Sequence, residues 1–406
     1  MVFAFRSQPL KTIYIVYFGL STLFVRLPFW IANSIIPATR QRRSWSFKHA
    51  VLVQFLRAGV GMFYATGIGG PPDAEKDAQS AAELGLVWIE PASSDLIVAD
   101  VALAAKANNV HPTRTSGYWI GERDASGRHG HRARAGEKVL YTLHGGAFIT
   151  GTGTPKGAWG ENITKPILSL KPNAFRRAFA LEYRLASAAP YTATNPFPSA
   201  LLDAIAGYRY LVQDLGFDPK DILVEGDSAG GQLALNLVTY LVHSQLADLA
   251  PPGALLMLSP TADWACTHDN DPASSMTRNY YSDYIHRVLD CRYSARALRG
   301  TLSETELASN AYLSPGSLKL QNERGYFSNF PPTCIVAGEA EVMLDPMRML
   351  RDRLVADNSA ESVIYQEYAN APHAWLLVTA FEPYRSAALE GIKHWIEAVF
   401  EAGHSV

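Results

Sequence analysis

From about Leu84 onward, short apolar runs alternate with longer stretches in which apolar residues recur at helical spacing. The runs have the length of strands and are rich in β-branched and aromatic residues, and such alternation is typical of βα units. Two stretches, 200–215 and 229–243, carry the clearest helical pattern. The chain therefore predicts an α/β fold with a mostly parallel sheet, and its clearest strands are 138–143, 178–183, 222–225, 254–258, 333–337 and 362–368.

The amino-terminal segment does not follow this alternation. Residues 12–36 are almost wholly apolar, with Arg26 and Pro28 as interruptions, and the stretch is long enough to cross a bilayer. It would also suit a buried helix of a cap domain, or a helix in the membrane interface beside Trp30 and Trp45. A cleaved signal peptide is disfavoured, because Arg26 interrupts the apolar core and no small-x-small cleavage site follows. We expect the segment to stay attached and to associate the protein with a membrane.

A loop-like stretch separates this segment from the rest of the chain. Residues 46–66 carry a second apolar pattern, and residues 67–80 follow with Gly-Gly-Pro-Pro and with small and charged side chains. We predict a membrane-proximal or cap segment over 1–80 and a main domain over 81–406. Within the main domain, the long irregular polar stretch around 266–325 predicts a cap insertion over a site.

Composition narrows the class of function. The 406 residues carry 36 Lys and Arg against 38 Asp and Glu, with no extended basic stripe, so a nucleic-acid partner has no electrostatic support. A small neutral or apolar ligand is easier to accommodate. Three cysteines without a CxxC pair predict no zinc site, and a Cys266–Cys291 bridge remains an option only in an oxidising compartment.

Candidate chemistry begins where a predicted strand runs into Gly226-Asp227-Ser228-Ala229-Gly230 and then a helix. This is G-x-S-x-G in the strand-turn-helix context that the motif requires. Glycines two residues before and two after Ser228 relieve crowding at a strained turn, which lifts the hydroxyl above the sheet at a helix amino terminus. Ser228 is therefore the candidate nucleophile rather than a structural N-cap.

A serine hydroxyl needs a base to take its proton and an acid to orient that base. His373 follows the last predicted strand on a loop that can carry it back over the sheet edge, and it is the candidate base. Three carboxylates, Glu339, Glu341 and Asp345, follow the strand before it. Asp345 directly precedes a proline and a helical stretch and so resembles a helix N-cap, whereas Glu341 lies in the turn itself. Glu341 is the favoured acid, Asp345 the alternative and Glu339 the third choice.

The stretch His144-Gly145-Gly146 directly follows another predicted strand. Paired glycines there fit either a plain tight turn or a loop whose exposed N–H groups stabilise an anion. With Ser228 as the nucleophile, we interpret the N–H groups of Gly145, Gly146 and Ala229 as an oxyanion hole for a tetrahedral alkoxide. His144 would then hold the loop in shape and would not act as the base.

From about Gly117 to its carboxyl end, the chain resembles the hormone-sensitive-lipase-like family of α/β-hydrolases, which includes arylacetamide deacetylases and fungal steryl acetyl hydrolases. The resemblance rests on 144–146, 182–186, 196–198 followed by Asp203, 226–230 and His373. It implies an α/β-hydrolase fold, with an eight-stranded, mostly parallel sheet flanked by helices and a helical cap. It also implies hydrolysis of carboxylic esters without a cofactor or metal.

Two positions depart from the family pattern. Ala147 stands where relatives have a third glycine, which leaves the first two N–H donors in place and narrows the acyl pocket. Glu341 stands where relatives usually carry aspartate, and Asp345 matches the second acid of the pattern. The resemblance implies that glutamate can serve as the acid.

The resulting hypothesis is a serine hydrolase of the carboxylesterase and lipase type, with Ser228, His373 and Glu341 as catalytic residues. Its suggested substrate is a small apolar ester, a short acyl group on a bulky apolar alcohol, which places it in lipid metabolism. An amide deacetylase or an acyltransferase would use the same residues, and a non-catalytic ligand receptor would keep the scaffold without turnover.

The sequence leaves open both the membrane association of the protein and the side of the membrane on which its catalytic domain lies. The resemblance and the sequon Asn162-Ile163-Thr164 suggest a membrane-associated protein of the endoplasmic reticulum with a lumenal catalytic domain. The basic residues Arg40, Arg42, Arg43 and Lys48 instead favour a cytoplasmic catalytic domain. A soluble cytoplasmic protein is the other alternative.

Overall fold

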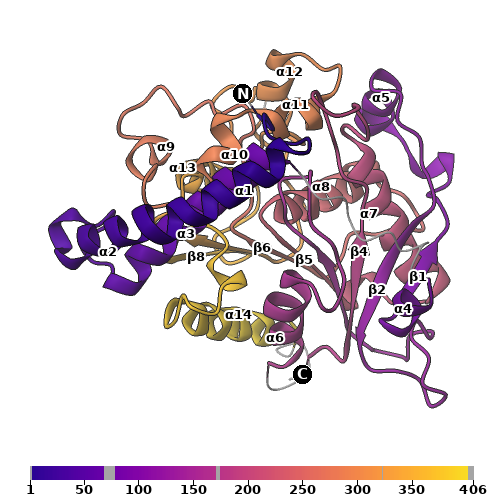
Figure 1. The fold of residues 1–406 in the computed structure, drawn as a ribbon. Coiled ribbons are helices and arrows are strands. Elements are labelled where there is room, and N and C mark those ends of the chain that lie inside the picture. Colours follow the sequence, from indigo (N-terminus) through magenta and orange to yellow (C-terminus); the bar gives the residue numbers. More distant parts are fainter. Residues whose placement is uncertain (1, 68–77, 171–173, 322, 401–406) are drawn as a thin grey trace.

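An eight-stranded sheet runs through the computed structural model, which describes residues 2–67, 78–170, 174–321 and 323–400 (Figure 1). In spatial order its strands are β1 (Leu86–Ile89), β2 (Thr115–Gly121), β4 (Arg177–Glu182), β3 (Val139–Leu143), β5 (Ile222–Asp227), β6 (Ala254–Leu258), β7 (Thr333–Gly338) and β8 (Val363–Tyr368). The pairs β1–β2 and β2–β4 are antiparallel, whereas every pair from β4 to β8 is parallel. The predicted α/β class with a mostly parallel sheet is confirmed.

The six strands predicted from the sequence all lie within two residues of their predicted bounds, whereas β1 and β2 were not identified. β1 has only four residues, and β2 contains Gly117 and Gly121, which weaken the apolar pattern of a strand. Gly117 is required by packing, because a Cβ there would collide with the ring of Phe179 on the neighbouring strand.

Helices cover both faces of the sheet. In β3, Val139 and Tyr141 belong to the hydrophobic cluster on one face, and Leu140 between them belongs to the cluster on the other. The first face carries α7 (Ser199–Arg209), α8 (Ala229–Ser244) and α13 (Leu344–Asp357), and the second carries α6 (Lys165–Leu168) and α14 (Tyr384–Phe400) (Figure 1). Burial on both faces explains why these strands appear in the sequence as continuous apolar runs.

Shorter helices occupy the connections. They are α4 (Ala78–Glu83) and α5 (Ala99–Ala107), and, in the stretch predicted as a cap insertion, α9 (Ser275–Arg278), α10 (His286–Asp290), α11 (Tyr293–Arg299) and α12 (Glu304–Ser309). Single π-helical turns lie at Thr22–Arg26, Gly160–Thr164 and Tyr210–Asp214, and 3₁₀ turns lie at Pro37–Thr39, Ser94–Leu96, Pro219–Asp221 and Trp375–Leu377.

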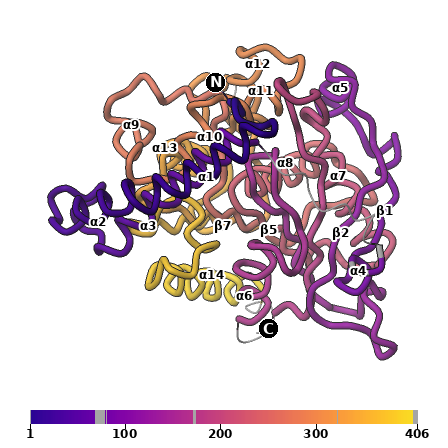
Figure 2. The backbone as a smooth tube through the Cα atoms, in the orientation of Figure 1, coloured from indigo at the N-terminus to yellow at the C-terminus, as the bar shows by residue number. Residues whose placement is uncertain are grey.

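The amino-terminal segment forms a helical hairpin against the main domain (Figure 2). α1 (Leu10–Ser21), a π-helical turn and α2 (Leu27–Ile35) make one helix of 26 residues, which is long and apolar enough to cross a membrane. After a short connection, α3 (Phe47–Thr66) runs back along it. Most of the loop predicted over 67–80 lies outside the described residues.

The disulfide that the sequence left open is not formed. All three cysteines are free and buried. Cys266 lies in the large hydrophobic cluster on the α8 face of the sheet, whereas Cys291 lies in a separate cluster with Phe3 and Tyr64. The two thiols therefore pack as apolar side chains in different clusters.

Candidate active site

Ser228 lies in the sharp turn between β5 and α8. Its backbone is left-handed, with φ 57° and ψ −118°, a conformation that side chains rarely adopt. Gly226 and Gly230 make the turn sterically possible, because a Cβ on Gly226 would collide with the carbonyl of Gly230 and a Cβ on Gly230 with that of Leu143. The turn is held by a hydrogen bond from the Ser228 N–H to the Leu258 carbonyl, 2.8 Å long.

His373 lies between Ser228 and Glu341. Its Nε2 is 2.8 Å from Ser228 Oγ, and its Nδ1 is 2.8 Å from Glu341 Oε2. A carboxylate only accepts hydrogen bonds, so Nδ1–H donates to Glu341 and Nε2 is left to accept the serine proton. His373 and Glu341 are both buried. The structure thus brings the three predicted side chains into one hydrogen-bonded chain across the carboxyl edge of the sheet.

Ser259, which sequence reasoning missed, fixes the other oxygen of Glu341. Glu341 Oε1 accepts from the Ser259 hydroxyl at 2.8 Å and from the Gly338 N–H at 2.6 Å. The same Ser259 Oγ accepts from the N–H of Ala374, which adjoins His373. Ser259 directly follows β6, so its position at the carboxyl end of a strand is the only signal that the sequence offers.

Asp283 is the second residue that sequence reasoning missed. It is fully buried and accepts hydrogen bonds from the N–H groups of Val342 (2.7 Å), Tyr284 (2.7 Å) and His373 (3.3 Å). It therefore ties together the loop that carries Glu341 and the loop that carries His373. No motif marks it, because it comes from the polar insertion, far from both loops in the sequence.

The two other candidate acids lie away from His373. Asp345 accepts from the N–H of Ser275 at 2.7 Å and pairs with Arg278 at 2.8 Å, and Glu339 pairs with Arg42 at 2.9 Å. The predicted N-cap role of Asp345 is wrong, because α13 begins at Leu344 and Asp345 lies within its first turn. There the carboxylate still favours the helix through its dipole and through the Arg278 pair.

Three carboxyl groups set the charge around His373. Burial by itself lowers the pKa of His373, but the hydrogen bond and charge of Glu341, with the charges of Asp283 and Asp227, raise it to about 9. Burial raises the pKa of Asp283 to about 6 and that of Asp227 to about 7, although the His373 charge opposes both changes. The site therefore stabilises an imidazolium at His373, the form that a base reaches after taking a proton.

The loop after β3 presents backbone N–H groups near Ser228. Gly146 has φ 112°, and a Cβ there would collide with the Thr150 carbonyl, whereas a Cβ on Gly145 would lie 2.8 Å from the Asp227 carbonyl. Among the described residues, the N–H groups of Gly145, Gly146 and Ala229 donate no hydrogen bond. These three donors therefore remain available to a ligand.

His144 shapes this loop. Its ring stacks on Tyr183 with centroids 4.2 Å apart, and its Nδ1 donates to the Gly145 carbonyl at 2.7 Å. The Tyr183 hydroxyl donates to the His144 carbonyl at 2.6 Å. Burial lowers the pKa of His144 to about 4, so the ring is neutral near pH 7. His144 is therefore a neutral ring whose hydrogen bond to Gly145 and stacking on Tyr183 fix the conformation of the loop.

An apolar cavity of about 430 Å³ opens above Ser228. Ser228, His373 and Gly146 lie at its base, with Ala147, Trp264 and Ile285 among its walls. The remaining wall is α3, whose side of the cavity is formed by Phe55, Leu56, Gly59, Val60, Phe63 and Tyr64. The second apolar run of the amino-terminal segment thus completes the site that the main domain begins.

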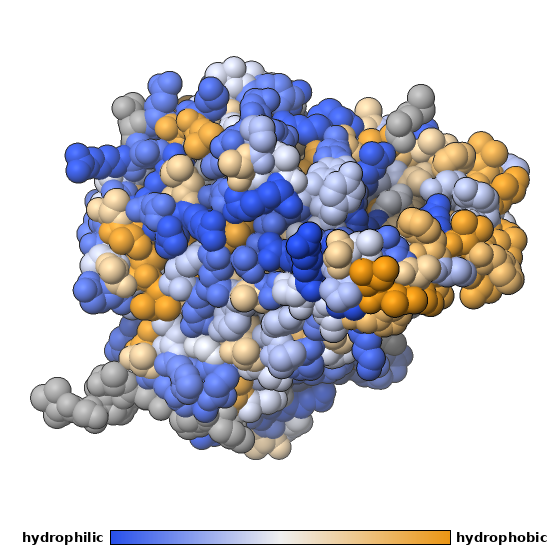
Figure 3. Space-filling view, turned by 90° about the vertical axis from the view of Figure 1, so that its left-hand side faces the viewer, coloured by the Kyte–Doolittle hydropathy of each residue, from blue (hydrophilic) through white to orange (hydrophobic). Residues whose placement is uncertain are grey.

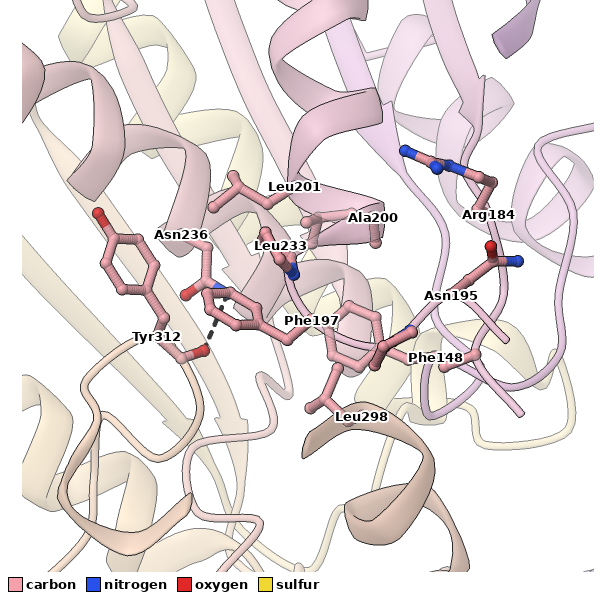
Figure 4. A pocket seen from close by; sticks show the side chains of 13 residues that line it. Phe148, Arg184, Asn195, Phe197, Ala200, Leu201, Leu233, Asn236, Leu298 and Tyr312 are labelled. Atoms are coloured by element: carbon pink, nitrogen blue, oxygen red, sulfur yellow. Dashed lines mark hydrogen bonds between the residues drawn. The ribbon is translucent and has the colours of Figure 1, made fainter. Parts of the chain in front are cut away.

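A smaller cavity is lined by Phe148 (Figure 4), and Ser228 is not among its lining residues. It has only about 10 Å³ of room for a water-sized molecule and is enclosed mainly by Phe148, Phe197, Leu201, Leu233, Leu298 and Tyr312. The ring of Phe148 lies 6.3 Å from that of Trp264, a wall of the larger cavity. Trp264 lines the cavity above Ser228, whereas Phe148 lines the smaller one.

Comparison with known proteins agrees with this geometry. Residues 140–377 match a family model described as the alpha/beta hydrolase fold. The chain is 30% identical to an acetyl-hydrolase of Streptomyces hygroscopicus over 60% of this chain and 70% of that protein. It is 26% identical to steryl acetyl hydrolase 1 of Saccharomyces cerevisiae over 33% of this chain and 29% of that protein.

Among solved structures, a hormone-sensitive lipase from a metagenome library superimposes with a TM-score of 0.54 at 21% identity, over 86% of this chain and 98% of that one. This likeness supports the fold, and the family model covers more than half of the chain. The resemblance predicted from the sequence is confirmed. The chain belongs to the α/β-hydrolase family and is an enzyme of the carboxylesterase and lipase class.

Proposed function

We propose that the protein hydrolyses carboxylic esters through Ser228, His373 and Glu341. The observation that carries the proposal is the hydrogen-bonded chain Ser228–His373–Glu341 at the base of an apolar cavity. His373 Nε2 takes the hydroxyl proton while Oγ attacks the ester carbonyl carbon, and Glu341 stabilises the imidazolium that forms.

The tetrahedral intermediate carries its negative charge on the former carbonyl oxygen. The N–H groups of Gly145, Gly146 and Ala229 are the proposed donors to that oxygen, and each donor of this kind contributes about 3–4 kcal/mol to transition-state stabilisation. His373 then returns its proton to the leaving alcohol, and the carbon–oxygen bond to the alcohol breaks. In the second half, water adds to the acyl-Ser228 ester with His373 as the base, and the acid leaves.

The proposed substrate is a short acyl ester of a bulky apolar alcohol. The cavity walls are largely apolar, and 430 Å³ lies within the range of small-molecule sites. Ala147, which directly follows the oxyanion loop, lines the cavity together with Trp264. The names of the two relatives, an acetyl-hydrolase and a steryl acetyl hydrolase, agree with a short acyl group.

The test is hydrolysis of p-nitrophenyl acetate, butyrate and octanoate by the purified full-length protein. We expect kcat/KM to fall from acetate to octanoate, and Ser228→Ala and His373→Ala to lose activity by about 10⁴-fold or more while melting at an unchanged or higher temperature. Wild-type activity that survives in Ser228→Ala would overturn the proposed nucleophile.

Two further outcomes separate the rival activities. Faster turnover of a p-nitroanilide than of the matched ester would make the protein an amide deacetylase. Transfer of the acyl group to an added alcohol in preference to water would make it an acyltransferase. A wild-type protein that binds these esters without turnover would instead support a ligand receptor.

A further inference from the structure

The helix Leu10–Ile35 has its polar and apolar faces reversed relative to a helix of a water-soluble protein. Ser34, Thr22 and Trp30 lie on its buried side, whereas Phe24, Val25 and Phe29 are 63–69% exposed. Arg26, which with Lys11 is one of two charged residues in this helix, is half-buried, and its guanidinium lies 4.8 Å from the Phe18 ring centroid. An apolar outer face with a polar inner face is suited to a helix that has hydrocarbon around it.

The apolar outer face is extensive. Figure 3 shows apolar surface concentrated on one projecting part of the molecule, and the exposed apolar side chains of α1, α2 and their connection belong to it. They include Ile13, Val16, Leu20, Leu23, Phe24 and Ile35, each more than half exposed. A continuous exposed apolar surface of this size marks an interaction site on a protein.

Both ends of this helix are fixed to the same side of the main domain. Before the helix, Phe3 is fully buried, donates its N–H to the Tyr64 carbonyl at 2.7 Å and packs edge-on against Tyr293 at 4.8 Å. After the helix, Arg42 donates to the Glu339 carbonyl and Trp45 Nε1 to the Asn370 carbonyl. A spanning helix would separate its two ends by about 30 Å of hydrocarbon, so Phe3 could not occupy this place.

The charge of the segment identifies the kind of surface. Residues 1–66 contain eight Lys and Arg and no Asp or Glu, although acidic residues outnumber basic ones over the whole chain. Arg43 and Lys48, which follow the helix in the sequence, are exposed and form no ion pair among the described residues. A basic segment with an apolar outer face is complementary to a bilayer that carries anionic headgroups.

We propose that Leu10–Ile35 lies in the plane of a bilayer leaflet, with both ends on the side of the catalytic domain, and that the ester reaches Ser228 from that leaflet. The second part rests on the proposed function. α3 packs against the lipid-facing helix and forms a wall of the cavity, and Phe55 on α3 is half-exposed while lining the cavity. Apolar surface therefore continues from the helix to the mouth of the site.

The first experiment measures binding to vesicles of phosphatidylcholine with and without phosphatidylserine. The double variant Phe24→Glu/Phe29→Glu should lose vesicle binding by at least about tenfold, and added phosphatidylserine should strengthen wild-type binding. The matched control is Leu103→Glu, because Leu103 on α5 is 67% exposed and distant from the segment in the sequence. Equal binding by the double variant and by wild type would overturn the proposal.

The second experiment determines on which side the ends lie. Because the natural cysteines are buried, single exposed cysteines at Ser7→Cys and Arg43→Cys can be labelled selectively with a membrane-impermeant maleimide in sealed membranes from expressing cells. Ala247→Cys reports the side of the catalytic domain. Both ends should react as Ala247→Cys does, whereas a Ser7→Cys that differs in labelling from Arg43→Cys and Ala247→Cys, in either direction, would show a spanning helix and overturn the proposal.

The third experiment separates this proposal from the proposed function. Phe24→Glu/Phe29→Glu should hydrolyse soluble p-nitrophenyl acetate like wild type, but should hydrolyse a sterol acetate embedded in vesicles about tenfold more slowly. If the wild-type protein hydrolyses neither substrate, the proposed esterase function is refuted. Equal rates of the variant and wild type on the embedded ester would refute only delivery from the leaflet.

Discussion

The loops at the carboxyl edge of the sheet and the amino-terminal helix satisfy their polar and apolar groups in opposite ways. Around His373, each polar side chain that holds the loops has a defined partner, as Ser259 and Asp283 show. On the helix, the Oγ of buried Ser34 has no hydrogen-bond partner among the described residues, and Phe24 faces outward. The difference teaches that one region fixes its side chains by hydrogen bonds, whereas the other has the apolar exposure that our proposal assigns to contact with a bilayer.

The largest expected effect tests whether position at the carboxyl edge, and not charge alone, sets the role of an acid. Glu341→Gln removes the negative charge that stabilises the imidazolium and leaves one acceptor oxygen for the His373, Ser259 and Gly338 donors, so we expect kcat on p-nitrophenyl acetate to fall by about 10⁴-fold. Asp345→Asn, the matched change four residues later, weakens the pairs with Arg278 and Arg348, which lie away from His373, and should keep kcat within about threefold. Equal losses in the two variants would remove Glu341 as the acid.

The next effect compares burial in the two regions by one substitution. Leu223→Ala in β5 creates a cavity at a fully buried site and should lower the free energy of unfolding by about 3 kcal/mol. Leu23→Ala, at a site 57% exposed, should change it by no more than about 0.5 kcal/mol in detergent-free buffer. Chemical denaturation of both variants measures the difference, and a Leu23→Ala cost as large as that of Leu223→Ala would mean that the helix face is packed in solution.

Two buried serines sharpen the comparison. Ser259→Ala deprives Glu341 of a donor and Ala374 of an acceptor, so kcat should fall by about tenfold. Ser34→Ala removes a buried hydroxyl that has no hydrogen-bond partner among the described residues, so stability and activity should stay unchanged or improve slightly. An unchanged kcat in Ser259→Ala would show that the Gly338 N–H alone positions Glu341.

The smallest expected effect concerns pH. Because neighbouring carboxylates raise the pKa of His373 and the base must be neutral, kcat/KM should increase as pH rises through the alkaline range. Asp283→Asn removes one of these negative charges and keeps one of the two acceptor oxygens, so the rising limb should move to lower pH by about one unit or less. A pH profile of p-nitrophenyl acetate hydrolysis measures this, and a limb that stays in place would exclude an electrostatic role for Asp283.

Local patterns carried much of the prediction. The turn around Ser228 and the stretch His144-Gly145-Gly146 are short, and their backbone requirements are written in adjacent residues. Asp283 lies 90 residues from His373, and Ser259 lies 82 from Glu341, so only the completed sheet brings them together. The N-cap assignment of Asp345 failed by two residues, because the N-cap is Met343 and the helix begins at Leu344, before the proline.

The amino-terminal segment shows the same limit. Its apolar length favoured a spanning helix but was also compatible with a cap helix or an interfacial helix, since these share composition. Only the contact of Phe3 with Tyr64 and the lining of the cavity by α3 distinguish them, and neither contact is local in the sequence. Composition supports the proposed membrane affinity of the segment, and tertiary contacts support its proposed orientation.

The left-handed backbone of Ser228 sets folding and chemistry against each other. Holding a residue with a side chain in this conformation costs about 1–3 kcal/mol. Gly226 and Gly230 make room for the turn but do not remove this strain. A glycine at position 228 would relieve this strain, so a lineage released from selection for turnover would gain robustness by losing its hydroxyl. Under the proposed mechanism, selection for ester hydrolysis therefore keeps Ser228 in place at a cost in the stability of the fold.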